Sequence, residues 1–141
     1  MGWSKQLRVA GLVTLGAAII PGALVVGVGV MLWSSRRTSS AVDALVARTT
    51  PGTSLEQLLD DPFVQRSAHV SVRGPFTEDA EYPDADDAAR RRVLTRLRAL
   101  APTATGSLSL MWYSLPPFGR LFLDVTFEAG LVTHAKSSSL D

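Results

Sequence analysis

The most constraining feature of this 141-residue chain is an uncharged run near its start. No charged side chain occurs from residue 9 to residue 35, and the stretch from Val9 to Trp33 reads VAGLVTLGAAIIPGALVVGVGVMLW. A bilayer core needs about 20 apolar helical residues to cross, so this run is long enough to span it with some tilt. Trp3 and Trp33 stand where interfacial aromatic residues are usual. We predict one transmembrane helix over about residues 9–33.

The alternative to an anchor is a cleaved signal peptide. The apolar region of a signal peptide has about 7–15 residues, far fewer than this run. No A-x-A-like cleavage site follows Trp33, where the chain reads SSRRTSS. We therefore predict an uncleaved, single-pass anchor in the cell membrane. Lys5 and Arg8 favour a cytoplasmic N-terminus, while Arg36 and Arg37 favour the reverse. Because a short N-terminal tail is common in signal anchors, we expect N-in, C-out, with an extracytoplasmic domain.

Charge divides the chain into two parts. Residues 1–37, the N-terminal tail and anchor, hold four basic and no acidic side chains, while residues 38–141 hold ten basic and thirteen acidic ones. The second part lacks the excess of positive charge that phosphate binding needs, so no nucleic acid is expected as a partner. The chain has no cysteine, which excludes disulfides, thiolate metal sites, a cysteine nucleophile and a lipid anchor on cysteine.

Small residues recur at four-residue spacing within the expected anchor. Ala10, Thr14, Ala18 and Gly22 would lie nearly in one column of a helix, and such a column lets a second helix approach closely. The alternative is that glycine and alanine are simply frequent in membrane helices. Pro21 lacks an amide hydrogen and can kink the middle of the span.

After a polar exit at residues 34–40, the pattern predicts a small α+β domain over residues 38–141. Two short helices come first. One is AVDALVAR, with Ser40 as its N-cap. The other follows a capping-box pattern at residues 53–56 and ends before Pro62, since proline disfavours helical geometry in the residue before it.

Residues 63–105 are expected to form an inserted loop with its own helix. AHVSVR at residues 68–73 alternates weakly, as a short strand does. Residues 74–87 are polar and acidic, which favours a loop or lid. Asp84 is the expected N-cap of an arginine-rich helix from about Ala85 to Leu100.

The C-terminal part alternates apolar and polar residues, as antiparallel strands with one buried face do. The alternation covers residues 107–113 and 120–128, which are joined by a proline-rich turn at 116–119. A tight turn at residues 129–130 then leads into LVTHAK. We predict a three-stranded antiparallel meander, covered on one face by two or three helices from the upstream sequence.

Three short motifs stand in a characteristic order within this domain. TPGTSLEQLLDDP introduces a helix at residues 50–62, and residues 107–137 contain MWY and then LFLDVTFEAGLVTHAKS. This order resembles the SmpA/OmlA family, the small BamE-like lipoproteins of the bacterial outer-membrane assembly machine. The positions that match the motifs of that family are Gly52, Thr53, Glu56, Gln57, Leu58, Pro62, Trp112, Tyr113, Phe127, Gly130 and Val132. The resemblance implies helices packed on a meander and a role in envelope assembly.

The chain departs from that family in two ways. The lipid-bearing cysteine is absent, and the expected transmembrane helix stands in its place. Residues 63–105 are an insertion relative to the family pattern. The resemblance is therefore mainly a guide to the fold, because a fold does not determine a function.

The sequence shows no pattern of catalytic or metal-binding residues. His69 and His134, the two histidines, lie far apart in separate expected strands. Asp124 and Glu128 share one strand face but would lie about 13 Å apart, too far for a paired-carboxylate site. No G-x-S-x-G elbow or phosphate-binding loop is present. We predict no enzyme activity, catalytic residue, metal or cofactor; a hydrolytic enzyme has no positive signal.

Two surfaces are candidates for binding. The arginine-rich helix suits acidic lipid headgroups or an acidic partner, unless the acidic stretch before it neutralises a merely solvated face. The outward face of the meander presents aromatic residues and methionine, which are typical of interface cores, unless a third helix covers them. The candidate residues are Arg90, Arg91 and Arg92 on the helix and Met111, Tyr113 and Phe122 on the sheet.

These features together predict a membrane-anchored protein-interaction domain. We expect an accessory or assembly subunit of a bacterial cell-envelope membrane complex, with membrane lipids and either a membrane protein complex or further copies of this chain as partners. The alternative is a membrane-tethered ligand-binding or sensory domain, in which the 74–87 loop closes over a pocket between helices and sheet.

Overall fold

The computed structural model describes residues 3–81, 84–115 and 119–140. The chain divides into two compact units, Met1–Ser34 and Ser35–Asp141. The second unit is an α+β domain in which helices and a five-stranded antiparallel sheet share one core.

Helix α1 (Trp3–Arg48) is continuous through the polar segment SSRRTSS. The expectation of a separate short helix after a polar exit at residues 34–40 is therefore wrong. The segment contains no glycine or proline, and serine, threonine and arginine cost at most about 0.7 kcal/mol each in a helix. Its polar composition indicates contact with water but does not interrupt helical hydrogen bonding.

The described part of α1 contains one segment, Ile19–Arg48, that is long and apolar enough to cross a membrane. Its apolar window has a mean hydropathy of 1.5 and makes no buried contact, and the large side chains of its first half are more than 50% exposed. An unburied apolar helix needs an apolar surrounding, which a bilayer supplies. The same length and composition also occur in signal sequences, so this segment is a candidate span.

The sheet has the strand order β2-β1-β3-β4-β5, and every neighbouring pair is antiparallel. Its strands are β1 (His69–Arg73), β2 (Glu78–Glu81), β3 (Gly106–Leu115), β4 (Gly119–Glu128) and β5 (Leu131–Leu140). Strands β3, β4 and β5 form the predicted meander. The sheet has five strands where the sequence predicts a meander of three, because β1 and β2 extend the meander on one side.

Three short helical elements follow α1. They are α2 (Leu55–Leu59), the 3-10 helix η1 (Val64–Arg66) and α3 (Asp87–Leu100). The expected side-chain capping of α2 is not made, since its N-cap Ser54 forms no cap hydrogen bond. The N-cap of α3 is Asp86 and not Asp84; the Asp86 carboxylate accepts a hydrogen bond from the Ala89 amide at 2.6 Å.

The core lies between one face of the sheet and these helices. Buried side chains from the last turns of α1, from α2 and from α3 meet alternate residues of the strands. The core residues are Val42, Leu45, Leu55, Leu58, Leu59, Val64, Val70, Val72, Val93, Leu94, Leu97, Leu108, Leu110, Trp112, Leu123, Val125, Phe127 and Val132, with smaller alanines. Trp112 stacks on Phe63 with ring centroids 4.7 Å apart, and its indole Nε1 donates to the Phe63 carbonyl at 3.1 Å.

The predicted turn at residues 129–130 connects β4 to β5 and also fastens the sheet to the helical layer. Ala129 and Gly130 both have positive φ, at 49° and 76°, as tight hairpin turns require. The Gly130 amide donates to the Ala104 carbonyl, and its own carbonyl accepts from the Leu55 amide, both at 2.9 Å. The other predicted turn falls at Pro116, Pro117 and Phe118, which lie outside the described residues.

Candidate functional site

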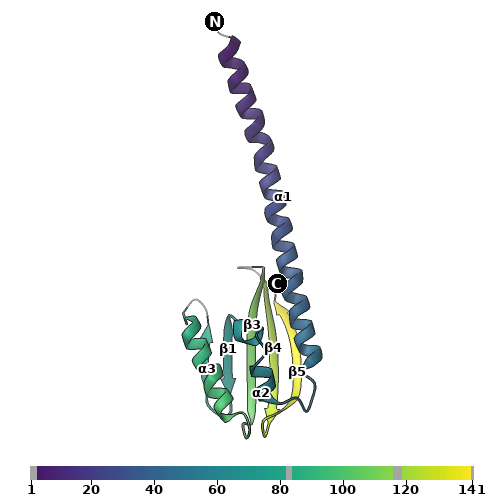
Figure 1. Ribbon diagram of the computed structural model, residues 1–141, viewed down its shortest axis with the longest axis vertical. Helices are drawn as coiled ribbons and strands as arrows, with labels where there is room; N and C mark the ends of the chain where they lie inside the picture. The colour runs from purple at the N-terminus through teal and green to yellow at the C-terminus, as the bar shows by residue number, and fades with distance from the viewer. Residues whose placement is uncertain (1–2, 82–83, 116–118, 141) are drawn as a thin grey trace. The chain divides into compact units, whose positions relative to one another are not determined.

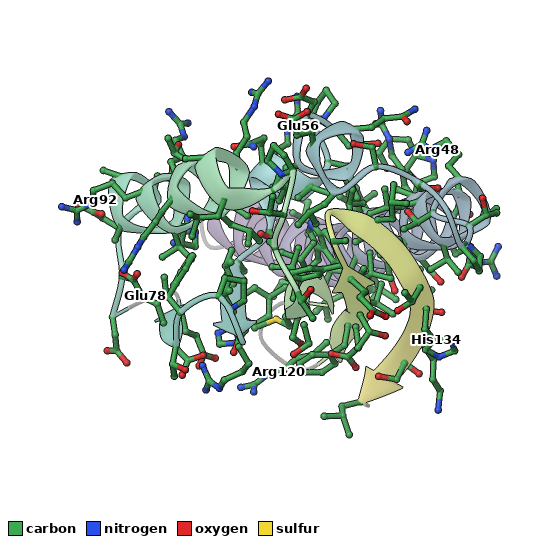
Figure 2. The ribbon with its side chains drawn as sticks, turned by 90° about the horizontal axis from the view of Figure 1, so that it is seen from below. Arg48, Glu56, Glu78, Arg92, Arg120 and His134 are labelled. Carbon is green, nitrogen blue, oxygen red and sulfur yellow. The ribbon has the colours of Figure 1, made fainter. Side chains whose placement is uncertain are left out.

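The second face of the sheet is the main candidate surface. In Figure 2 the helices α2 and α3 lie on one side of the sheet, and the labelled Glu56 of α2 points away from it on that side. Arg120 of β4 and His134 of β5 lie on the other side. Within the unit Ser35–Asp141, none of the described helical segments covers this second face, which we call the open face. The expected outward-facing surface of the meander therefore exists, and β1 and β2 widen it.

A row of polar residues crosses the open face. Strand register places in one line Asp79, Ser71, Ser109, Asp124 and Lys136. The Ser109 hydroxyl donates to the Asp124 carboxylate at 2.6 Å. Beside this row, a depression of about 200 Å³ lies among side chains that include Ser107, Thr126 and His134. The centre of the open face is hydrophilic, in contrast to the apolar interface core expected there.

At one end of this row, Asp79 forms an ion pair with Arg73. The Arg73 guanidinium donates to the Asp79 carboxylate at 2.7 Å. This hydrogen bond, together with one from Ser71, holds the pKa of Asp79 below its usual value, and it raises the pKa of Arg73. Both side chains are about half exposed, so the pair orders this end of the sheet and adds little stability.

The three sheet residues named as binding candidates occupy different environments. Met111 and Phe122 are directly opposite each other on neighbouring strands, and His69 is the neighbour of Met111 on β1. Met111 is only 1% exposed, whereas Phe122 and Tyr113 are half-buried. The exposed parts of Phe122 and Tyr113 are accessible from outside the domain. Met111 is buried beside them and is not accessible.

Two buried polar groups near Met111 were not singled out from the sequence as binding residues. The Ser67 hydroxyl and His69 Nδ1 are buried and have no hydrogen-bond partner among the described residues. His69 Nδ1 lies 3.7 Å from a carboxylate oxygen of Glu81, which is beyond hydrogen-bond distance. No sequence signal marks these groups, because their burial arises only when β1, β2 and β3 come together.

The arginines of α3 are largely engaged within the domain. Arg90 is paired with Asp87 and donates to the Ala85 carbonyl at 2.8 Å. Arg96 contacts Glu78 at 3.1 Å and lies over the ring of Phe76, 4.3 Å from its centroid. A further ion pair joins Arg98 to Asp60 at 2.7 Å. Partners of two of these arginines come from the acidic stretch 78–87.

Of the three arginines named as binding candidates, two stay exposed. Arg91 and Arg92 form no ion pair with any residue that the structure describes. Figure 2 shows Arg92 directed outward at the end of the domain formed by α3. Two of the three candidate arginines therefore remain available to an external anion, while Arg90 is engaged within the domain.

A cavity of about 360 Å³ lies between β2 and α3. Its lining combines small side chains with charges, and consists of Glu78, Asp79, Ala80, Ala85, Ala89, Arg92, Val93 and Arg96. Part of the predicted 74–87 loop is strand β2, so a strand and not a lid forms one wall of this cavity. Its volume is at the lower end of the range for small-molecule sites.

The candidate column in the anchor is only partly described. The side chains of Ala10, Thr14 and Ala18 lie outside the described residues. At Gly22, an added Cβ would meet no atom within 4 Å. That side of Gly22 is open and leaves room for a neighbouring helix.

Comparisons with known proteins do not assign the chain to a family. No protein-family model, curated protein or solved structure matches it. Within the described residues, no group of three or more His, Asp or Glu side chains is arranged to hold a metal ion. The surfaces described above are therefore the basis for any functional interpretation.

Proposed function

We propose that this chain is a single-pass membrane protein whose small domain binds another protein. In this proposal it is an accessory or assembly subunit of a bacterial cell-envelope membrane complex. The observation that carries the proposal is a sheet covered by helices on one face only, in a chain that also contains an unburied apolar helix. An uncovered sheet face with half-buried aromatic residues suits a protein partner. The envelope location rests on the motif resemblance at residues 50–62 and 107–137.

Anchoring gives this function a simple physical mechanism. A membrane helix confines the domain to the membrane surface and raises its effective concentration toward partners in the same membrane. Weak contacts through the open face then suffice for stable association. On this proposal the domain lies outside the cytoplasm and works by binding, without catalysis or a cofactor.

The cavity between β2 and α3 favours a second candidate, a membrane-tethered ligand-binding or sensory domain. Its alanine-rich floor and the free guanidinium of Arg92 suit a small molecule with an anionic group. The acidic Glu78 and Asp79 in the same lining oppose such a ligand. The open face does not need to bind a ligand against opposing charges in this way. We therefore prefer the protein-binding proposal.

Purification of the full chain from its native membrane in mild detergent tests the proposal. Chemical cross-linking before extraction retains weak companions, and mass spectrometry identifies them. We expect a companion membrane protein at a fixed ratio to this chain. A clean monomer after cross-linking would contradict the proposal and direct attention to the cavity between β2 and α3.

The membrane orientation can be tested separately, because the chain contains no cysteine. Single cysteines at Thr103→Cys, an exposed position of the domain, and at Gly2→Cys report the two sides of the membrane. With N-in, C-out topology, a membrane-impermeant maleimide labels the first variant in intact cells and the second only after lysis. The reverse labelling pattern would place the domain in the cytoplasm.

A further inference from the structure

Strand β5 forms one edge of the sheet, and its first residues are already paired on their outer side. The Gly52 amide donates to the Val132 carbonyl, and the Val132 amide donates to the Thr53 carbonyl, both at 2.8 Å. Ser54 and Leu131 form an antiparallel bridge beside these bonds. The chain thus adds a short extended segment to the beginning of this edge and then turns away.

The remainder of that edge, Thr133–Leu140, is not paired with any other segment that the structure describes. We call it the β5 edge. No backbone hydrogen bond joins it to any described residue outside the sheet. In an edge strand, alternate residues direct both N–H and C=O outward, so several pairs of donors and acceptors face away from β4. Such a row is a template for one more strand.

The opposite edge of the sheet is protected in ways that the β5 edge is not. Strand β2 has four residues, three of which are acidic, and short charged strands discourage further pairing. Strand β5 has ten residues, no proline and a single lysine, Lys136. Its register irregularity lies at Thr133, which has no partner opposite residues 126–127, and leaves His134–Leu140 regular. Further strand pairing is thus favoured at β5.

Charge indicates which kind of segment fits this edge. His134 and Lys136 lie on the open-face side of β5, in register with Thr126 and Asp124 of β4. The residues on the helical side are small, and Ala135 and Ser137 among them are half-buried. An extended segment with a carboxylate near Lys136 and apolar side chains toward Ala135 complements β5. The same segment is repelled by the acidic β2.

A second copy of this chain fits the β5 edge poorly. Within the domain, the end of α1 from Ser35 to Arg48 and strand β5 lie along the same direction and run oppositely (Figure 1). Two β5 strands paired antiparallel about a twofold axis would place the two Ser35 residues at opposite ends of the dimer. Because both chains would need to enter one membrane just before Ser35, this geometry disfavours self-pairing.

We propose that the β5 edge binds an extended, acidic segment of a partner protein by strand addition. This inference rests on the proposed function and specifies the contact that it uses. The partner segment forms main-chain hydrogen bonds with Thr133–Leu140 and places a carboxylate beside Lys136. Main-chain bonds supply affinity, and the charge of Lys136 supplies the preference for acidic sequence.

The test uses the full chain in its native membrane, with a photo-cross-linking residue in place of Ser138 on the β5 edge. A matched variant carries the same residue in place of Glu81 on β2, which is also exposed and lies on the open-face side of the other edge strand. We expect Ser138, and not Glu81, to cross-link the companion protein. In the purified complex, amide exchange over Thr133–Leu140 should slow at least about tenfold, which corresponds to about 1.4 kcal/mol of added protection.

A pair of substitutions tests the preference for an acidic segment. Lys136→Gln should lower companion recovery about threefold, whereas Arg66→Gln, which also removes one exposed positive charge, should leave it unchanged. Thermal melting of both variants shows that the domain remains folded.

Three other results would overturn the proposal. Cross-linking from Ser138 to another copy of this chain would show that the β5 edge binds a second copy and not a different protein. A companion that cross-links only from Glu81, with unchanged exchange over Thr133–Leu140, refutes the β5 edge and leaves the proposed function intact. Absence of any companion refutes the proposed function and this inference together.

Discussion

The two faces of the sheet differ in what they contribute to this domain. On strand β4, the neighbours Leu123 and Asp124 point to opposite sides. Leu123 is fully buried under the helices, while Asp124 is exposed and bonded to Ser109. The helical side is a continuous apolar core, and the open face is a mixture of charged, hydroxyl and half-buried aromatic side chains. One strand thus separates residues that stabilise the fold from residues that are available for binding.

This difference shows where function can change without loss of the fold. Each buried residue contacts several others, so its replacement affects the whole core. Residues of the open face contact mainly their cross-strand neighbours, and such pairs contribute about 0.2–1 kcal/mol each. Substitutions on the two faces should therefore differ in their effect on stability by several kcal/mol.

The largest expected effect is that of Leu123→Asp. It places a carboxyl group at a position with 0% exposure, where the lost apolar packing and the desolvation of the carboxyl together cost several kcal/mol, a large share of the about 5–15 kcal/mol that stabilises a typical domain. We expect loss of the folded domain, measured by near-ultraviolet circular dichroism and protease resistance in detergent. A cooperative melt close to that of the original chain would mean that the helical side is not the core.

A smaller loss is expected for Gly130→Ala, at the turn that fastens the sheet to the helical side. The added Cβ would lie 2.2 Å from the Ala101 carbonyl oxygen, and φ is +76°. We expect a destabilisation of about 3 kcal/mol in thermal or chemical melts.

Gly52→Ala is the matched control for this turn. Gly52 also has positive φ, at +92°, but its Cβ would meet no atom within 4 Å. Backbone strain alone should cost about 1–2 kcal/mol there. Equal losses in both variants would show that close contact with the helical layer does not stabilise the turn.

The two-face arrangement was largely predictable from the sequence, because alternation along β3 and β4 reports one buried side. Strand β2 was not, since EDAE has a single apolar residue, Ala80, and forms a strand only through its pairing with β1. The polar segment SSRRTSS did not predict the continuity of α1, because polar residues change the exposure of a helix without interrupting its hydrogen bonds. Local sequence indicates which side of a strand is buried, but a polar edge strand depends on a distant partner.

The candidate site was predictable to a similar degree. Alternation placed Met111, Tyr113 and Phe122 on the outward face. It did not predict that Met111 is buried, because that burial depends on neighbours such as His69 and Phe122 on other strands. Likewise, the partners of the α3 arginines include Asp60, which is distant in sequence.

Phe122→Asp tests the open face directly and pairs with Leu123→Asp, one residue away on the opposite side. Phe122 is half-buried, so its loss should cost about 1–2 kcal/mol and leave the domain folded. Recovery of the companion protein from native membranes should fall at least about tenfold, as for central aromatic residues of interfaces. Unfolding of this variant would instead assign Phe122 to the core and remove the distinction between the two faces.

The smallest expected effect concerns the ion pair between Arg73 and Asp79 on the open face. The hydrogen bond from Arg73 lowers the pKa of Asp79 in the folded domain. This contribution to stability is therefore present above the ordinary carboxyl pKa of about 4 and is lost as the pH falls through the lower, folded value. Arg73→Gln should lower Tm slightly at pH 6, and the difference should shrink as the pH falls below the ordinary carboxyl pKa of about 4. Arg91→Gln, which removes a charge without an ion pair, should show no such pH dependence. A pH-independent difference for Arg73→Gln would mean that Arg73 acts through its packing, and that even the polar open face contributes to the fold by burial.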